Sequence, residues 1–169
     1  MQNSEIPKLF KNPIYKDKRG SLGEVFKNSN INPKFVIQTS SKKNVFRGFH
    51  FQKKYQQSKY IYLLKGEVID FAINLKKNSK SFGKIYEFKL RPGYSVFIPK
   101  GYAHGYYTYS NENIILYIMD NFQKKYYEDG INIYDKKFKF KFKKNKIIIS
   151  DKDKMWQSYN EFKKNIKGL

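Results

Sequence analysis

The most constraining feature of this sequence is a series of short apolar segments with the alternating pattern of β-strands. In the segment 68–75 (VIDFAINL) the large apolar residues share one face: Ile69, Phe71, Ile73 and Leu75. A period of two is typical of a strand. The segment 138–142 (FKFKF) alternates in the same way, which predicts phenylalanines inward and lysines outward. Residues 94–99 and 113–119 are apolar runs of strand length.

Turn-forming residues separate these segments. They fall at 65–67 (KGE), 91–94 (RPGY), 99–102 (PKGY) and 128–130 (EDG). Many short strands with regular turns predict a mostly β sandwich or barrel. A length of 169 residues is enough to bury a core, to which the aromatic residues, 18% of the chain, must contribute much. We therefore expect a single domain over residues 1–169.

The end of the chain follows a different pattern. Met155, Tyr159, Phe162 and Ile166 recur at three- and four-residue spacing. This apolar stripe predicts a short C-terminal helix that begins near Asp151 or Asp153.

Composition excludes several classes of protein. The chain has no cysteine, so it contains no disulfide, thiolate nucleophile or zinc–thiolate site. The net charge is +21, but lysines supply nearly all the positive charge and are scattered. A basic surface of this kind attracts anions in general, and we do not expect nucleic acid as the main partner. Because we find no apolar leader and no run of membrane-spanning length, we expect a cytoplasmic protein without membrane contact.

One turn motif has a well-defined spacing. In "GYSVFIPKGYAHGYY" (93–107), Gly93, Pro99, Gly101 and His104 lie at intervals of six, two and three residues. This motif resembles the second conserved box of the cupin superfamily. The resemblance implies a double-stranded β-helix, or jelly-roll barrel, with His104 directed into its mouth.

Cupins often bind a metal ion through histidines from two such boxes. This chain has only two histidines, His50 and His104. A three-histidine site is therefore excluded, and no spacing supports a site of two histidines and a carboxylate. We expect a barrel without metal or other cofactor.

Several further motifs are similar to those of the dTDP-4-dehydrorhamnose 3,5-epimerase family. They are "YKDKRGSLGE" (15–24), "RGFHFQ" (47–52), "GEVIDFAINLKKNSKSFGK" (66–84), "IPKGYAHGYY" (98–107) and "IISDKD" (148–153). The resemblance covers roughly residues 13–153 in order. It implies metal-independent epimerisation, at C3, C5 or both, of a 4-keto-6-deoxy sugar linked to a nucleoside diphosphate. The expected nucleotide is dTDP, and the expected assembly is a homodimer.

The same resemblance implies roles for individual residues. His50 is the expected base and Asp153 its carboxylate partner. Lys59 is expected near the carbonyl oxygen of the sugar, and Tyr117 is expected to be the acid on the opposite face.

The remaining expected residues bind the substrate. Arg47 is expected to contact the diphosphate, and His104 and Gln52 to help hold the substrate. Arg19 and Glu24 match positions that contact the nucleotide, often across a dimer interface in this family.

These residue types suit the chemistry of a 4-keto sugar. The ketone acidifies the hydrogens at C3 and C5, so inversion needs a base, an acid on the other side, and a donor or positive charge at the oxygen. A neutral imidazole is a suitable base near pH 7. Arg47 and His50 are three residues apart, so strict pleating would put them on opposite faces. A local twist or bulge at Gly48 would bring both into one cavity.

Simpler interpretations and other functions remain open at this stage. His50 could be a hydrogen-bonded core residue, Tyr117 a packing residue, Lys59 a solvated side chain and Asp153 a helix cap. The alternative functions are a 3,4-ketoisomerase of 4-keto sugar nucleotides, a non-catalytic nucleotide-sugar-binding module and a nucleic-acid-binding protein. A ketoisomerase would use a histidine base without an acid across the ring.

Overall fold

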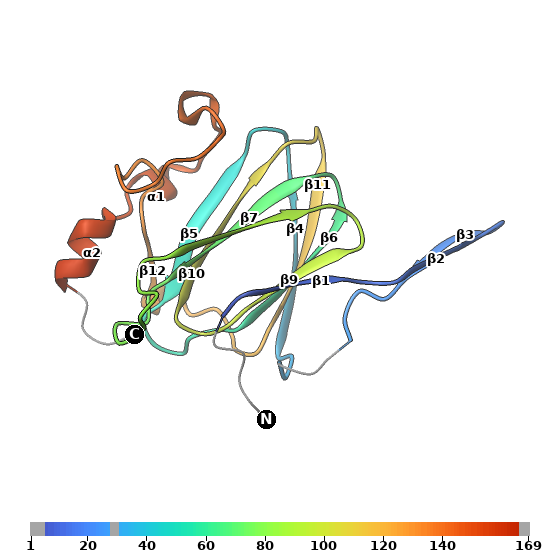
Figure 1. Cartoon of the computed structure of the whole chain (residues 1–169), viewed down its shortest axis with the longest axis horizontal. Helices are drawn as coiled ribbons and strands as arrows, with labels where there is room; N and C mark the ends of the chain where they lie inside the picture. Colours follow the sequence, from blue (N-terminus) through green and yellow to red (C-terminus); the bar gives the residue numbers. More distant parts are fainter. Residues whose placement is uncertain (1–5, 28–30, 166–169) are drawn as a thin grey trace.

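Two five-stranded antiparallel sheets form the body of the protein in the computed structural model, which describes residues 6–27 and 31–165 (Figure 1). The first sheet has the order β1-β9-β6-β11-β4 and the second the order β12-β5-β10-β7-β8. The strands of the first sheet are β1 (Lys8–Lys11), β4 (Phe35–Ser41), β6 (Lys59–Lys65), β9 (Tyr94–Ile98) and β11 (Asn113–Met119). Those of the second are β5 (Phe46–Gln52), β7 (Val68–Asn74), β8 (Ile85–Leu90), β10 (Tyr102–Thr108) and β12 (Glu128–Gly130). This confirms the predicted mostly β, cupin-like jelly roll.

The alternating segment 68–75 is buried on both faces. Ile69 and Phe71 belong to an apolar cluster on the outer side of the second sheet, whereas Val68 and Ala72 belong to the cluster between the two sheets. Because successive strand residues point to opposite faces, the same alternation directs Asp70 into the barrel interior. The pattern therefore predicted the strand correctly, but the large apolar residues that define it lie on the outer face of the sheet and not in the barrel interior.

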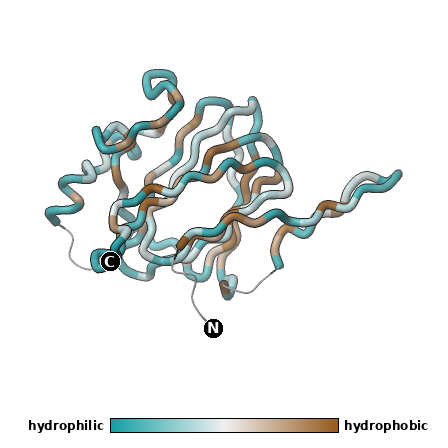
Figure 2. The backbone as a smooth tube through the Cα atoms, viewed as in Figure 1, coloured by the Kyte–Doolittle hydropathy of each residue, from teal (hydrophilic) through white to brown (hydrophobic). Residues whose placement is uncertain are grey.

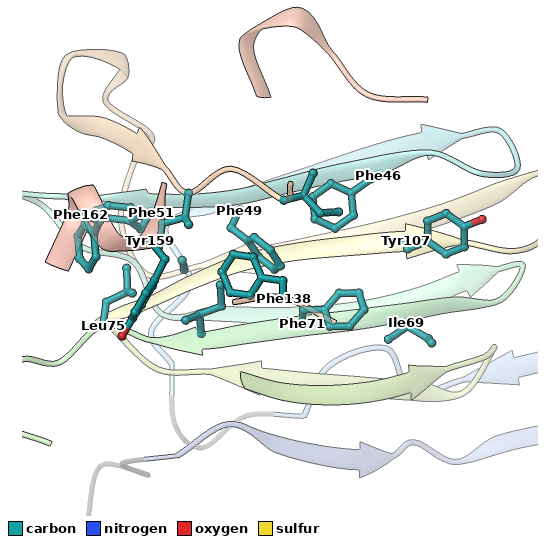
Figure 3. Close-up of a cluster of buried hydrophobic side chains, with 14 of the residues drawn as sticks. Phe46, Phe49, Phe51, Ile69, Phe71, Leu75, Tyr107, Phe138, Tyr159 and Phe162 are labelled. Atoms are coloured by element: carbon teal, nitrogen blue, oxygen red, sulfur yellow. The ribbon is translucent and has the colours of Figure 1, made fainter. Parts of the chain in front are cut away.

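The outer side of the second sheet is covered by the segment that follows the barrel. Figure 3 shows Phe138, Tyr159 and Phe162 packed against side chains of the sheet. The ring of Phe142 stacks on Tyr107 with centroids 4.0 Å apart. Brown apolar stretches in Figure 2 follow these strands, and the C-terminal segment is mixed in hydropathy. The C-terminal segment therefore provides a second apolar layer outside the barrel.

Two predicted local structures are wrong. Residues 138–142 do not form a strand, although Phe138 and Phe142 are buried as predicted. The phenylalanine rings stack on one another, with Phe140 and Phe142 centroids 5.0 Å apart, and the backbone has no partner strand. Residues 128–130 were expected to be a turn, but they form β12, because their backbone pairs with β5.

The predicted C-terminal helix is divided into α1 (Asp151–Lys154) and α2 (Tyr159–Asn165). Gln157 interrupts it, because its backbone pairs with Ile131 and its carbonyl accepts from Asn132 N at 2.8 Å. A capping box starts α2: Ser158 Oγ accepts from Glu161 N, and Glu161 Oε2 accepts from Ser158 N. Met155, expected in the apolar stripe, is exposed, and Ile166 lies outside the described residues.

The remaining elements lie at the edges of the barrel. Two short 3-10 helices are η1 (Lys125–Tyr127) and η2 (Lys144–Lys146). The hairpin of β2 (Ile14–Asp17) and β3 (Gly20–Gly23) extends away from the body, as the blue arm in Figure 1. Among the described helices, none is long and apolar enough to cross a membrane.

Candidate active site

A cavity of about 250 Å³ is lined by side chains from both large sheets. The lining residues are Ile37, Thr39, Arg47, His50, Phe51, Gln52, Gln57, Lys59, His104, Tyr106, Tyr117, Met119, Gln123 and Glu128. Six of the nine residues predicted from the sequence belong to this set: Arg47, His50, Gln52, Lys59, His104 and Tyr117. The fold thus gathers chemical groups from β5, β6, β10 and β11 around one space.

A β-bulge at Gly48 explains how Arg47 and His50 share the cavity. In the pairing of β5 with β10, His50 is opposite His104 and Arg47 is opposite Tyr106, so two residues of β5 face one of β10. Gly48 has φ +135°, and a Cβ there would lie 2.5 Å from the Cα of Gly105. Only glycine fits both the conformation and the space. The structure thus contains the bulge that brings both residues into one cavity.

His50 forms a short hydrogen bond with Asp153, which comes from α1. The distance from His50 Nε2 to Asp153 Oδ1 is 2.7 Å. The imidazole is about one-third exposed, whereas the carboxylate side chain is 5% exposed. Asp153 Oδ2 accepts from Gly48 N at 3.2 Å, and Oδ1 also accepts from Trp156 Nε1 at 3.2 Å. Burial acts to raise the pKa of Asp153, but the hydrogen bond and charge of His50, with the two further donors, hold it below its usual value.

Asp153 is not the cap of α1. Ser150 is the N-cap, and its hydroxyl accepts a hydrogen bond from Asp153 N. The carboxylate of Asp153 is directed to His50 instead. The interpretation of Asp153 as a simple capping residue is therefore excluded.

A second histidine–aspartate pair lies deeper and involves a residue that the sequence reasoning missed. His104 Nε2 lies 2.7 Å from Asp70 Oδ2, and both side chains are almost fully buried. Asp70 Oδ1 has no hydrogen-bond partner among the described residues. Burial raises the pKa of Asp70 and lowers that of His104, although each partner opposes the shift of the other. The signal for Asp70 was the single carboxylate in the strand-like segment 68–75.

Lys59 lies at the start of β6 and lines the cavity. The residue as a whole is half-buried, but its ammonium group is deep enough that burial lowers its pKa to about 8, against the opposing charges of Asp70 and Glu128. The cavity therefore contains a cation that loses its proton only slightly above neutral pH. The interpretation of Lys59 as an ordinary solvated lysine is excluded.

Tyr117 comes from β11, in the sheet opposite to that of His50. The residue is 8% exposed, and its ring centroid lies 5.7 Å from that of His104. Burial raises the pKa of its hydroxyl well above the usual value, and Tyr106 and Asp70 add to this effect. Tyr117 is thus a protonated donor at neutral pH, on the other side of the cavity from the His50 strand.

Arg47 and Gln52 differ in their freedom to contact a ligand. The guanidinium of Arg47 is held loosely, by Ser41 Oγ at 3.1 Å and Ser40 O at 3.4 Å, and the residue is exposed. The Gln52 amide is already engaged: its nitrogen donates to the carbonyls of Tyr55 and Phe122, and its oxygen accepts from Lys124 N. Gln52 therefore joins two loops at the edge of the cavity as well as lining it.

Arg19 and Glu24 are not brought to the cavity within the chain. Arg19 lies at the tip of the β2–β3 arm, where its guanidinium pairs with Asp17 at 2.6 Å. The Glu24 carboxylate lies 3.9 Å from Lys27 Nζ. Neither residue lines the cavity described above.

No group of three metal-ligating side chains occurs within residues 6–27 and 31–165. Both histidines of the chain direct Nε2 to an aspartate. The two histidine–aspartate pairs provide proton donors and acceptors for acid–base chemistry at the cavity.

The sequence matches a family of known proteins. The family model of dTDP-4-dehydrorhamnose 3,5-epimerase matches residues 5–161. The chain is 33% identical over 163 residues to the dTDP-4-dehydrorhamnose 3,5-epimerase of Shigella flexneri, covering 89% of this chain and 90% of the relative. It is 31% identical over 160 residues to the protein of the same name from Methanothermobacter thermautotrophicus, covering 88% and 86%.

A solved structure extends the comparison to the fold. The crystal structure of dTDP-6-deoxy-D-glucose-3,5-epimerase from Legionella pneumophila, in complex with dTDP-4-keto-L-rhamnose, superposes with a TM-score of 0.86. The two sequences are 27% identical, and the match covers 94% of this chain and 91% of that one. The chain therefore belongs to the dTDP-4-dehydrorhamnose 3,5-epimerase family.

Proposed function

We propose that this protein epimerises a dTDP-linked 4-keto-6-deoxy sugar without a metal ion, by proton transfer at the carbons next to the ketone. The observation that carries this proposal is the His50–Asp153 pair at the cavity, with Tyr117 supplied by the opposite sheet. Inversion requires removal of a proton from one face of a carbon and its return to the other face.

His50 is the proposed base. Its Nε2 donates to Asp153 Oδ1, which leaves Nδ1 as the ring nitrogen that accepts the proton from C3 or C5. The carboxylate fixes this tautomer and stabilises the imidazolium that forms, as in other His–Asp pairs. The lowered pKa of Asp153 supports this role, because the carboxylate remains ionised while His50 carries the additional proton.

Lys59 is the proposed partner of the sugar oxygen. When the carbon loses its proton, the electron pair moves to the C4 oxygen and gives an enolate. A buried ammonium near that oxygen stabilises the negative charge more than an exposed lysine would, because the surroundings have a low dielectric constant. The His104–Asp70 pair adds further polar groups near the cavity. Tyr117 returns a proton to the other face of the sugar ring.

Binding of the nucleotide is assigned to the outer part of the site. The exposed fork of Arg47 suits a diphosphate, to which arginine can form two parallel hydrogen bonds. The Legionella relative holds a dTDP-linked sugar, which supports this class of ligand. We also infer a homodimer in which the β2–β3 arm brings Arg19 and Glu24 to the cavity of a second copy.

The experiment that tests the function is proton NMR in deuterated water with dTDP-4-keto-6-deoxy-glucose. The wild-type protein should exchange the C3 or C5 hydrogen and invert the centre, and His50→Ala should reduce turnover by about 10²–10⁴-fold, the usual contribution of a general base. Binding of dTDP to the variant should change little. Wild-type turnover by His50→Ala would refute the proposed mechanism.

A further inference from the structure

Trp156 lies directly behind the proposed catalytic pair. It follows α1 and is half-buried. Its indole nitrogen donates to Asp153 Oδ1 at 3.2 Å, which is the same oxygen that binds His50. The ring also meets the His50 imidazole edge-on, with centroids 6.1 Å apart. One indole therefore contacts both members of the pair.

The fold provides a fitted place for this ring. A Cβ on Gly130 would lie 2.5–2.6 Å from three carbon atoms of the Trp156 indole. Gly130 is opposite His50 in the pairing of β12 with β5, and its φ does not lie in the left-handed region. Glycine is therefore needed at 130 for space, not for conformation. Lys152 Nζ lies 5.3 Å from the indole centroid and pairs with Glu128.

The shared oxygen has a physical consequence. A carboxylate oxygen that accepts from the indole has less negative charge to offer the imidazole. The indole therefore weakens the pull of Asp153 on the His50 proton while it fixes the orientation of the carboxylate. The indole and the imidazole thus share one oxygen of the Asp153 carboxylate.

We propose that Trp156, seated on Gly130, is a positioning residue that orients Asp153 and sets how readily His50 gains and releases its proton. This inference rests on the proposed function of His50 as the base. Trp156 does not line the cavity and acts only through the pair. In metal sites, hydrogen-bonding partners that orient a ligand cost about 10–100-fold when removed, and we take the lower end of this range for an indole that orients a carboxylate.

Trp156→Phe tests the indole N–H, because the variant keeps an aromatic ring over Gly130. We expect kcat to fall by about tenfold with an unchanged KM for the sugar nucleotide. The acid limb of kcat/KM should move to higher pH, because the unshared carboxylate holds the imidazolium proton more tightly. Gly130→Ala should shift the limb in the same direction by displacing the indole. In a Trp156→Ala background, Gly130→Ala should add little to the loss.

A direct titration keeps the test independent of turnover. The chain has only two histidines, so ¹⁵N NMR of the ring nitrogens can follow His50 in the wild type and in Trp156→Phe. The inference requires the His50 curve of Trp156→Phe to lie at higher pH than the wild-type curve. Superimposable titration curves would overturn it. Full turnover by His50→Ala would instead overturn the proposed function, and the two titrations would still decide the role of Trp156.

Discussion

Replacing Lys59 with arginine is expected to abolish the alkaline limb of the pH–rate profile. The wild-type ammonium has a pKa lowered to about 8, because burial in the cavity disfavours its charge. Arginine stays charged at every pH at which the protein is folded. If positive charge at this position stabilises the enolate, the two proteins should respond differently to alkaline pH.

The magnitude follows from the pKa. A group with a pKa near 8 is about nine-tenths protonated at pH 7 and about one-tenth protonated at pH 9, so wild-type kcat/KM should fall about tenfold between these values. The alkaline limb of the kcat profile should lie at higher pH than that of kcat/KM, because the bound diphosphate favours the charged form of Lys59. Tyr117 should not contribute, because its pKa is raised well above 10. Glu128→Gln should move the limb to lower pH, since the Glu128 charge supports the ammonium.

The assay is the initial rate of solvent deuterium incorporation in buffers from pH 6 to 10. Lys65→Arg is the matched control, because Lys65 ends the same strand with a side chain 62% exposed and pairs with Glu112. It should keep the wild-type profile. A wild-type profile that stays flat to pH 10, or an unchanged limb in Lys59→Arg, would refute the assignment.

Two further predictions concern the bulge and the proposed acid. Gly48→Ala should destabilise the protein by about 1–3 kcal/mol more than Gly20→Ala. Both glycines have similar positive φ, but only at Gly48 would a Cβ meet backbone atoms; equal losses in urea denaturation would contradict this reason. Tyr117→Phe should retain deuterium exchange catalysed by His50 while product inversion falls by about 10²–10⁴-fold. Full turnover by Tyr117→Phe would favour the ketoisomerase alternative.

The sequence predicted the barrel well because strand periodicity and turn residues are local signals. The alternating residues of 68–75 and the turn before His104 are both found in the structure. The two phenylalanines Phe138 and Phe142 were correctly assigned to the core, but not to the correct backbone conformation. Burial alone does not require a strand, because a segment can pack its side chains on a sheet without pairing with it.

The site was harder to predict where it depends on distant partners. The pairing of His50 with Asp153 spans 103 residues and was inferred only from family resemblance. Asp70 was missed because no local pattern shows that the interior face of its strand meets His104. Trp156 was likewise not singled out, because its proposed role depends on how its indole packs against Gly130, which is distant in the sequence. Such residues become visible only when the strands and the C-terminal segment are placed together.

The C-terminal segment connects the integrity of the outer layer to the competence of the site. Phe138, Tyr159 and Phe162 pack on the second sheet (Figure 3). Asp153, whose carboxylate binds His50, lies between Phe138 and Tyr159 in the sequence. All ten strands of the two large sheets end by Gly130, before the chain reaches Phe138. One segment of the chain therefore both covers the apolar outer side of the second sheet and supplies the carboxylate that binds His50.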